Sequence, residues 1–327
     1  MVEQRELRVI RMTWEAEDVI SVVLARIESD DPLPAWEPGA HIDVHVPDGS
    51  TRQYSLCGDP GDLSSWQIAV LREPAGRGGS AWVHDELRVG QRVLVTRPKN
   101  HFRLEDAEHY ALVAGGVGIT PIMVMAEHLA ARGRSFHLTY GGRSAATMAF
   151  RTRLAALGDR VTFLAEDTDG RPDLDRLVKD LSPNALAYVC GPVGLLRAVQ
   201  EAAAAAHGTD SDVVRFELFS RAGVEPAEEA EGTDGDGDGG TYELVLTRSG
   251  HTLRLKPEAN ILETVLELGV EVENDCRDGI CGSCVTPVRS GTVDHRDLVL
   301  TKREQKAMDQ MMICVSRPTC PRLELEL

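Results

Sequence analysis

The chain contains 327 residues, 42% of them apolar, and carries a formal net charge of −17. At about 150 residues per domain this length predicts two domains, with one or three allowed. The composition excludes a wholly disordered or fibrous protein, and the negative charge disfavours binding to nucleic acid or to anionic membranes. No apolar run reaches the roughly 20 residues of a membrane span, and the charged N-terminus lacks a signal peptide. We therefore expect a cytoplasmic protein.

Residues 1–104 read as short strands separated by turns. Apolar and polar residues alternate as in half-buried strands, and turn residues such as Pro60-Gly61 lie between them. The expected strands are 41–47, 52–56, 65–73 and 91–98. This pattern predicts an antiparallel β-barrel.

From residue 105 to residue 222 strands alternate with helices. The strand at 110–114 leads through a glycine-rich turn into a helix at 121–131, with Thr120 as the expected N-cap. Further strands are expected at 136–140, 161–166 and 185–191, and helices near 145–157, 174–181 and 193–206. The alternation predicts an α/β domain with a parallel sheet.

Residues 223–240 contain seven acidic residues and no basic ones, and almost nothing apolar. We interpret them as an extended acidic linker. The C-terminal part, 241–327, begins with two strands and a helix at 261–268 that is capped by Asn260. Further strands are expected at 313–318 and 322–327.

Four of the seven cysteines form the strongest motif. Cys276, Cys281 and Cys284 have the spacing C-x4-C-x2-C, and Cys314 follows after 29 intervening residues. This is the plant-type spacing for a [2Fe–2S] cluster, whereas zinc sites, the main alternative, more often use two separated C-x2-C pairs. Of the three other cysteines, Cys57 and Cys320 are expected to be small buried hydrophobes, and Cys190 belongs to a motif described below.

Two further motifs indicate phosphate-bearing ligands. The first motif, Arg52-Gln53-Tyr54-Ser55, lies at the end of a strand. The second is the turn at 76–80 (GRGGS), which is followed by a short helix. Together the two motifs supply an arginine and free backbone amides that could bind a flavin phosphate. The turn at 115–121 (GGVGITP) joins strand to helix, and the segment 190–192 (CGP) ends a later strand of the same domain. Ligands bind at such strand ends in open α/β sheets.

The motifs of this chain occur in the same order as in phthalate dioxygenase reductase and vanillate demethylase reductase. In chain order they are RQYSL, GRGGS, GGVGITP, CGP and the cysteine pattern. The whole chain apart from the linker resembles this family, whose third domain is a β-grasp ferredoxin domain. The resemblance implies three domains at 1–104, 105–222 and 241–327, which bind flavin, NAD(P) and [2Fe–2S] respectively.

The resemblance also implies roles for individual residues. Flavin contacts are expected from Arg52, Tyr54, Ser55, Ala69 and Val70, and phosphate contacts from Arg77, Gly79 and Ser80. Nicotinamide dinucleotide contacts are expected from Gly116, Gly118, Thr120, Pro121, Cys190, Gly191 and Pro192. Of these, Ser55, Thr120 and Cys190 lie nearest the reacting atoms and are the expected catalytic residues. Phe219 either approaches the flavin or packs in the core.

This interpretation predicts an NAD(P)H-dependent reductase that passes electrons through flavin and cluster to a terminal oxygenase, of the Rieske type or a haem monooxygenase. FMN is favoured over FAD, and NADH over NADPH, although Arg143 after the strand at 136–140 fits a 2′-phosphate. We expect a monomer. The alternatives are a redox-sensing regulatory protein and a self-contained oxygenase, but the sequence contains neither a DNA-binding motif nor a Rieske or haem motif.

Overall fold

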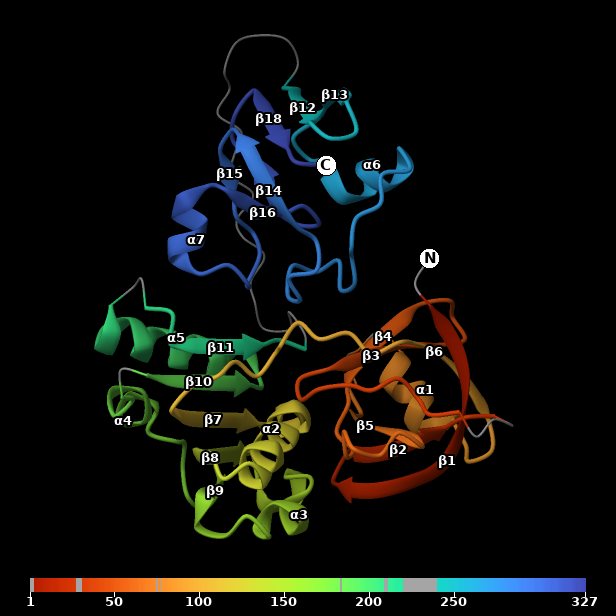
Figure 1. Ribbon diagram of the computed structural model, residues 1–327, viewed down its shortest axis with the longest axis vertical. Helices are drawn as coiled ribbons and strands as arrows, with labels where there is room; N and C mark the ends of the chain where they lie inside the picture. The colour runs from red at the N-terminus through yellow and green to blue at the C-terminus, as the bar shows by residue number, and fades with distance from the viewer. Residues whose placement is uncertain are drawn as a thin grey trace. The chain divides into compact units, whose positions relative to one another are not determined.

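The computed structural model describes residues 3–27, 31–74, 76, 78–182, 184–208, 211–219 and 240–327. The chain divides into two compact units, residues 1–219 and 220–327 (Figure 1). The acidic linker expected at 223–240 lies outside the described residues except for Gly240. Within the described ranges, no helix has the length and apolar character needed to cross a membrane.

The first unit begins with a six-stranded antiparallel sheet that curls into a barrel, with strand order β4-β3-β6-β1-β2-β5 (Figure 1). A bridge between Leu56 and Ile68 brings the chain after β4 against β5 at the two ends of this order. The elements are β1 (Gln4–Ala16), β2 (Val19–Ala25), β3 (His41–His45), β4 (Thr51–Ser55), β5 (Ser65–Leu71), α1 (Gly79–Asp85) and β6 (Arg92–Thr96). The predicted barrel is confirmed.

Sequence reasoning did not identify β1 and β2 as strands. In β1 the pairing register shifts between Val9 and Arg11 and again between Trp14 and Ala16. Each shift breaks the alternation of inward and outward side chains by which a strand is recognised. β2 is buried at five of its seven positions and therefore also lacks a clear alternation.

A five-stranded parallel sheet follows, with strand order β11-β10-β7-β8-β9. Its strands are β7 (His109–Gly115), β8 (Ser135–Gly142), β9 (Val161–Ala165), β10 (Ala185–Cys190) and β11 (Val214–Glu217). Its helices are α2 (Ile119–Ala131), α3 (Arg151–Ala155), α4 (Leu174–Lys179) and α5 (Val193–His207). The parallel sheet predicted from the alternation of elements is confirmed.

Two local predictions in this sheet are wrong. Thr120 is not the N-cap of α2, because a 3₁₀ turn at Gly116–Gly118 runs directly into the helix and Gly118 takes that position. The Thr120 hydroxyl donates instead to the carbonyl of Val117 at 3.0 Å. The helix expected near 145–157 is divided, because Phe150 adopts a left-handed conformation at φ 60° before α3.

The barrel and the parallel sheet share one hydrophobic core. Arg153 of α3 donates two 2.6 Å hydrogen bonds to Glu127 of α2 and a third, 2.8 Å long, to the carbonyl of Cys57 beside the barrel. The backbone amide of Glu17 also donates to the carbonyl of Ala146 at 2.9 Å. These bonds fix the ends of the barrel strands relative to the carboxyl ends of the parallel strands.

The second unit is a mixed five-stranded sheet with order β13-β12-β18-β14-β16. Its elements are β12 (Tyr242–Leu246), β13 (His251–Leu255), α6 (Ile261–Glu267), β14 (Val285–Ser290), β15 (Val293–Asp294), α7 (Lys302–Ala307), β16 (Gln310–Met312), β17 (Arg317–Pro318) and β18 (Arg322–Leu325). Asn260 caps α6 as predicted, since its side chain accepts from the amide of Glu263 at 3.4 Å.

The strand expected at 313–318 is only partly present. β16 ends at Met312, and the amides of Val315 and Ser316 both donate to the Met312 carbonyl in a turn. Strand structure resumes at Arg317. Cys314 therefore lies in a turn between two short strands.

Candidate functional site

The four cysteines of the C-terminal motif come together in two pairs. Cys284 and Cys314 are buried, and their sulfur atoms lie 3.1 Å apart. Cys276 and Cys281 are hydrogen-bonded to each other, and the shared proton lowers the pKa of the Cys281 thiol to about 5 while it raises the pKa of Cys276. Since each pair can bind one iron atom, the arrangement suits a two-iron cluster better than a single metal ion.

The loop between these cysteines is bent by three residues in the left-handed region: Arg277 at φ 58°, Gly279 at φ 68° and Gly282 at φ 83°. This bend turns the amides of Asp278 and Ile280 toward the Cys276 sulfur, at 3.3 and 3.5 Å. Amide donors of this kind stabilise a charged thiolate. The residues therefore fit a [2Fe–2S] cluster.

The other cysteines behave differently. Cys57 is buried in the first unit, and burial raises the pKa of its thiol to about 12. Cys320 is only half-buried, contrary to the expectation of a buried hydrophobe. Its sulfur lies 3.0 Å from the carbonyl oxygen of Arg322, to which the thiol donates. This local bond holds the thiol at the surface.

The flavin motifs RQYS and GRGGS, separate in the sequence, meet in the structure. A Cβ on Gly79 would lie 2.6 Å from Cγ and 2.8 Å from Nε of Arg52, so the arginine lies directly against the first turn of α1. Tyr54 on the same strand is half-buried, and burial raises the pKa of its phenol to about 12. Ser80 accepts a hydrogen bond from the Glu73 amide at 3.0 Å. Arg77 lies outside the described residues.

The two dinucleotide motifs also meet, through close contacts at two glycines where a larger residue would collide with its neighbours. A Cβ on Gly118 would lie 2.3 Å from the carbonyl oxygen of Cys190. A Cβ on Gly115 would lie 2.8 Å from Cδ of Pro192. Gly116, at φ 55°, has no atom within 4 Å of its Cβ position and therefore borders open space. The residues form a cradle at the carboxyl ends of β7 and β10, which fits a dinucleotide.

These two sites adjoin each other, because the barrel meets the carboxyl edge of the parallel sheet. Ser55, at the end of β4, is buried and donates to Glu217 Oε2 at 3.5 Å. Glu217 ends β11 and is the register partner of Cys190 at the end of β10. Burial, with the Glu217 charge as a second cause, raises the pKa of the Cys190 thiol, so the thiol stays protonated.

The other predicted residues lie around this junction. Ala69 and Val70 are buried on β5, which contacts the turn at 116–118. Thr120 and Pro121 are buried in the first turn of α2. The Phe219 side chain is 41% exposed, which contradicts simple core packing.

Sequence reasoning missed Glu217. It lies two residues before Phe219, in a segment that was not assigned to a strand. Its proximity to Ser55 and Cys190 depends on two features that no local pattern reveals, namely parallel pairing of β11 with β10 and contact between sheet and barrel. A strand prediction at 214–217 beside β10 is the signal that would have identified it.

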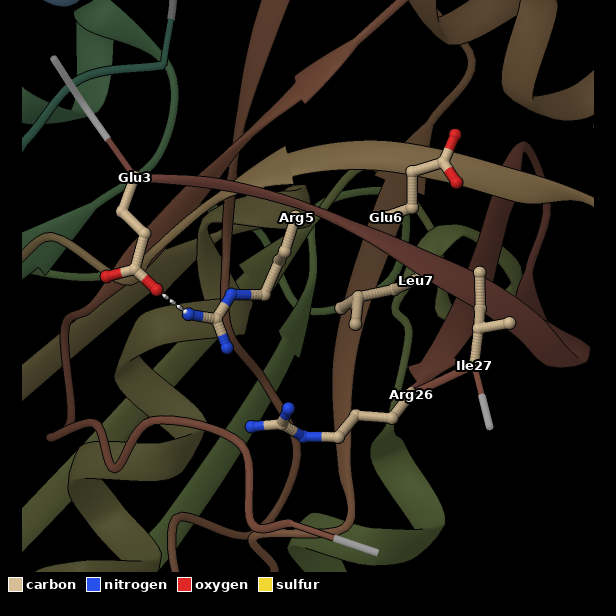
Figure 2. Close-up of a pocket in the computed structure, with 6 residues that line it drawn as sticks. All are labelled: Glu3, Arg5, Glu6, Leu7, Arg26 and Ile27. Atoms are coloured by element: carbon tan, nitrogen blue, oxygen red, sulfur yellow. Dashed lines mark hydrogen bonds and ion pairs between the residues drawn. The ribbon is translucent and has the colours of Figure 1, made fainter. Parts of the chain in front are cut away.

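A separate surface pocket of about 370 Å³ lies on the barrel along β1 and just after β2, as Figure 2 shows. Two arginines and two glutamates line it, and Arg5 is paired with Glu3. The carbon at the centre of the Arg5 guanidinium also lies 5.8 Å from the ring centre of Trp66. None of the predicted flavin or dinucleotide residues lines this pocket.

Comparison with known proteins supports the three binding functions. The family model of a 2Fe-2S iron-sulfur cluster binding domain matches residues 244–319, and that of an oxidoreductase NAD-binding domain matches residues 112–201. The phenoxybenzoate dioxygenase subunit beta of Ectopseudomonas oleovorans is 40% identical, over 98% of this chain and 97% of its own. The structure of phthalate dioxygenase reductase is 35% identical, with a TM-score of 0.69 and 98% of its chain covered.

Some similar proteins are longer. The structure of an intact type IV self-sufficient cytochrome P450 monooxygenase is 40% identical with a TM-score of 0.83, but the match covers 99% of this chain and only 41% of that one. The chain likewise spans about half of the oxidoreductase NdmD of Pseudomonas putida, 53% of its length at 36% identity.

Barrel, parallel sheet and four-cysteine domain together define an oxidoreductase that combines a flavin, a nicotinamide nucleotide and a [2Fe–2S] cluster. Several of the similar proteins are named as parts of oxygenase systems, among them the phenoxybenzoate dioxygenase subunit and reductase subunits of a toluene-4-sulfonate monooxygenase system. This chain belongs to the phthalate dioxygenase reductase family, together with vanillate O-demethylase oxidoreductases.

The contact between Ser55 and Glu217 leads to a first prediction. Glu217→Ala should slow flavin reduction by NADH about tenfold, because the Ser55 hydroxyl loses the acceptor that orients it. Flavin content should be unchanged, since the packing of Arg52 against Gly79 is left in place by this substitution. Stopped-flow absorbance under anaerobic conditions measures the rate. Asp212→Ala, a change at an exposed carboxylate before the same strand, is the control and should have no effect; equal rates in the two variants would contradict the prediction.

Proposed function

We propose that this protein oxidises NADH with FMN as its flavin and delivers the electrons singly to a separate terminal oxygenase. The observation that carries the proposal is the junction at which Ser55, Glu217 and Cys190 join the barrel to the dinucleotide cradle. When bound, the flavin accepts a hydride from the nicotinamide and releases electrons one at a time to the cluster. The similar proteins include a dioxygenase subunit and a self-sufficient cytochrome P450 monooxygenase. The oxygenase that receives the electrons is therefore proposed to be either a non-haem or a haem enzyme.

In this proposal the chain's own residues bind and orient the two ligands. Arg52 and the amides at Gly79 and Ser80 hold the flavin phosphate, and Tyr54 contacts the ring system. Ala69 and Val70 line the flavin site from β5, and Arg77 adds a phosphate contact. Ser55 lies at the reacting edge of the ring, and the exposed Phe219 covers the flavin.

On the nucleotide side, Gly116, Gly118 and Thr120 turn the chain around the pyrophosphate, and Pro121 begins the supporting helix. Cys190 lies beside the nicotinamide as a neutral thiol, with Gly191 and Pro192 completing the cradle. No group needs to donate or accept a proton during hydride transfer, so a protonated, buried thiol is compatible with this position.

We further propose that flavin binds to residues 1–104, nucleotide to 105–222 and the cluster to 241–327, joined by a linker at 223–240. The protein is proposed to act as a monomer in the cytoplasm, without contact to membranes or nucleic acid. The three cysteines outside the cluster motif, Cys57, Cys190 and Cys320, form no disulfide, which supports a reducing compartment. The four cluster ligands are Cys276, Cys281, Cys284 and Cys314.

The test is an anaerobic absorption titration of the purified protein with NADH and, separately, with NADPH. We expect flavin and iron–sulfur bands that both bleach at lower concentrations of NADH than of NADPH. Protein that contains zinc and no flavin, after growth with ample iron and riboflavin, would contradict the proposal. Bleaching without any rapid transfer to a one-electron acceptor would favour a redox-sensing protein instead.

The close packing of Arg52 against Gly79 gives a second prediction. Arg52→Ala should weaken flavin binding about tenfold to a hundredfold, since a charge-assisted contact of roughly 1.5–3 kcal/mol is lost. Fluorescence of flavin released on dilution and gel filtration measures the loss. Arg92→Ala, at an exposed arginine on β6 that pairs with Glu6, is the control and should keep full flavin content. An Arg52→Ala protein that also keeps full flavin content would refute the assignment.

A further inference from the structure

Asp297 is a fully buried carboxylate in the second unit, and it was not among the residues expected to have a role. Its side chain has no exposed surface, yet it accepts hydrogen bonds from the amides of Val299 and Leu300, at 3.1 and 2.8 Å. The Ser316 hydroxyl donates to its other oxygen at 3.4 Å. These donors satisfy the buried carboxylate in place of water.

The loop that carries Asp297 touches both chain segments that supply the cysteines. On one side, the Leu298 amide donates to the Gly279 carbonyl at 2.9 Å, and a Cβ on Gly279 would lie 3.3 Å from Cα of Asp297. On the other side, Ser316 follows Cys314 by two residues and bonds to Asp297. The carboxylate thus connects the cysteine loop at 276–284 with the turn that contains Cys314.

His295 adds a second buried polar group at the same place. Its side chain is only 5% exposed, and its Nδ1 lies 3.7 Å from Asp297 Oδ1. Neither ring nitrogen has a hydrogen-bond partner within the described parts of the chain. The Nε of the neighbouring Arg296 donates to Asp294 at 2.7 Å. The Asp297 carboxylate therefore lies among protein groups, out of contact with bulk water.

We propose that Asp297 is a positioning residue for the cluster, with two effects. Its hydrogen bonds hold the cysteine loop against the Cys314 turn, so that the four thiols are arranged before iron binds. Its charge lowers the reduction potential of the bound cluster, because a buried anion nearby makes the addition of an electron less favourable. The inference rests on the cluster assignment above and goes beyond it by naming a residue outside the cysteine motif.

The test compares Asp297→Asn with Asp294→Asn in the full-length protein. Both substitutions remove one negative charge and keep the side-chain shape, but Asp294 is 38% exposed and its charge is screened by water. A spectroelectrochemical titration of the cluster bands, with iron content measured in parallel, gives the readout. We expect a more positive midpoint potential in Asp297→Asn and no shift in Asp294→Asn. A wild-type potential in Asp297→Asn, with full iron content, would overturn the proposal.

If Asp297→Asn purifies without iron, thermal unfolding of the iron-free proteins distinguishes a positioning role of Asp297 from a purely structural one. An unfolding midpoint equal to that of iron-free wild type would support a positioning role, since the domain then folds but cannot arrange its thiols. A lower midpoint would overturn the proposal, because Asp297 would then be an ordinary structural residue. Absence of iron from the wild type itself would instead contradict the proposed function, so the two failures are distinguishable.

Discussion

Replacing Cys281 with serine is expected to remove the [2Fe–2S] cluster and stop electron delivery, while NADH continues to reduce the flavin. Cys281 has the lowered thiol pKa of its pair, which makes it a ready thiolate ligand, and serine supplies a much poorer donor to iron. Reduction of cytochrome c, a one-electron acceptor, should fall by about a hundredfold or more, because electrons reach it through the cluster. The hydride step should persist, since the junction of Ser55, Glu217 and Cys190 lies wholly in the first unit.

Cys320→Ser is the matched control for this prediction. Cys320 lies in the same unit but outside the four-cysteine motif, and its sulfur is hydrogen-bonded to backbone groups of Thr292 and Arg322. It should keep its iron, its absorbance bands and its rate of cytochrome c reduction. Loss of flavin reduction in Cys281→Ser would contradict the separation of the two functions, and full activity in that variant would contradict the ligand assignment.

The success of the cluster prediction reflects how local the motif is. Three of the four proposed ligands lie within nine residues, and the left-handed Gly279 and Gly282 that shape the loop are visible as glycines in the sequence. The fold class could also be predicted from the sequence. The first hundred residues show the periodicity of strands, whereas in the second hundred, strand patterns alternate with helix patterns. The capping role of Asn260 could also be predicted, since a cap depends on residues three apart.

What sequence reasoning missed depends on distant contacts or on broken periodicity. The Ser55–Glu217 contact joins residues 162 positions apart, and Asp297 gains its importance from Ser316 and Gly279. β1 was overlooked because two register shifts interrupt its alternation. Thr120 was misjudged because a threonine before a proline resembles an N-cap, whereas the preceding turn had already started the helix. In each case tertiary structure decided what the local pattern left open.

Gly118→Ala tests the contact between the two dinucleotide motifs directly. Gly118 has φ −60° and ψ −7°, a conformation that alanine adopts without strain, so any effect comes from the added methyl group. That group would lie 2.3 Å from the Cys190 oxygen, 2.5 Å from its carbonyl carbon and 2.7 Å from the Gly191 nitrogen. All three are backbone atoms of a central β-strand and the residue after it, so they cannot move aside as a flexible side chain can.

We expect Gly118→Ala to lower the free energy of unfolding of the first unit by about 1–3 kcal/mol. The KM for NADH should rise by about tenfold or more, because a shift of β10 against the turn displaces the cradle on both sides of the nucleotide. Urea unfolding and steady-state kinetics measure the two effects. Gly194→Ala is the control, since Gly194 lies in the first turn of α5 with no atom within 4 Å of its Cβ position. There alanine should be neutral or slightly stabilising, by up to about 1 kcal/mol. If both alanine variants behaved alike, Gly118 would not be packed against Cys190, and the cradle would have to be assigned to other residues.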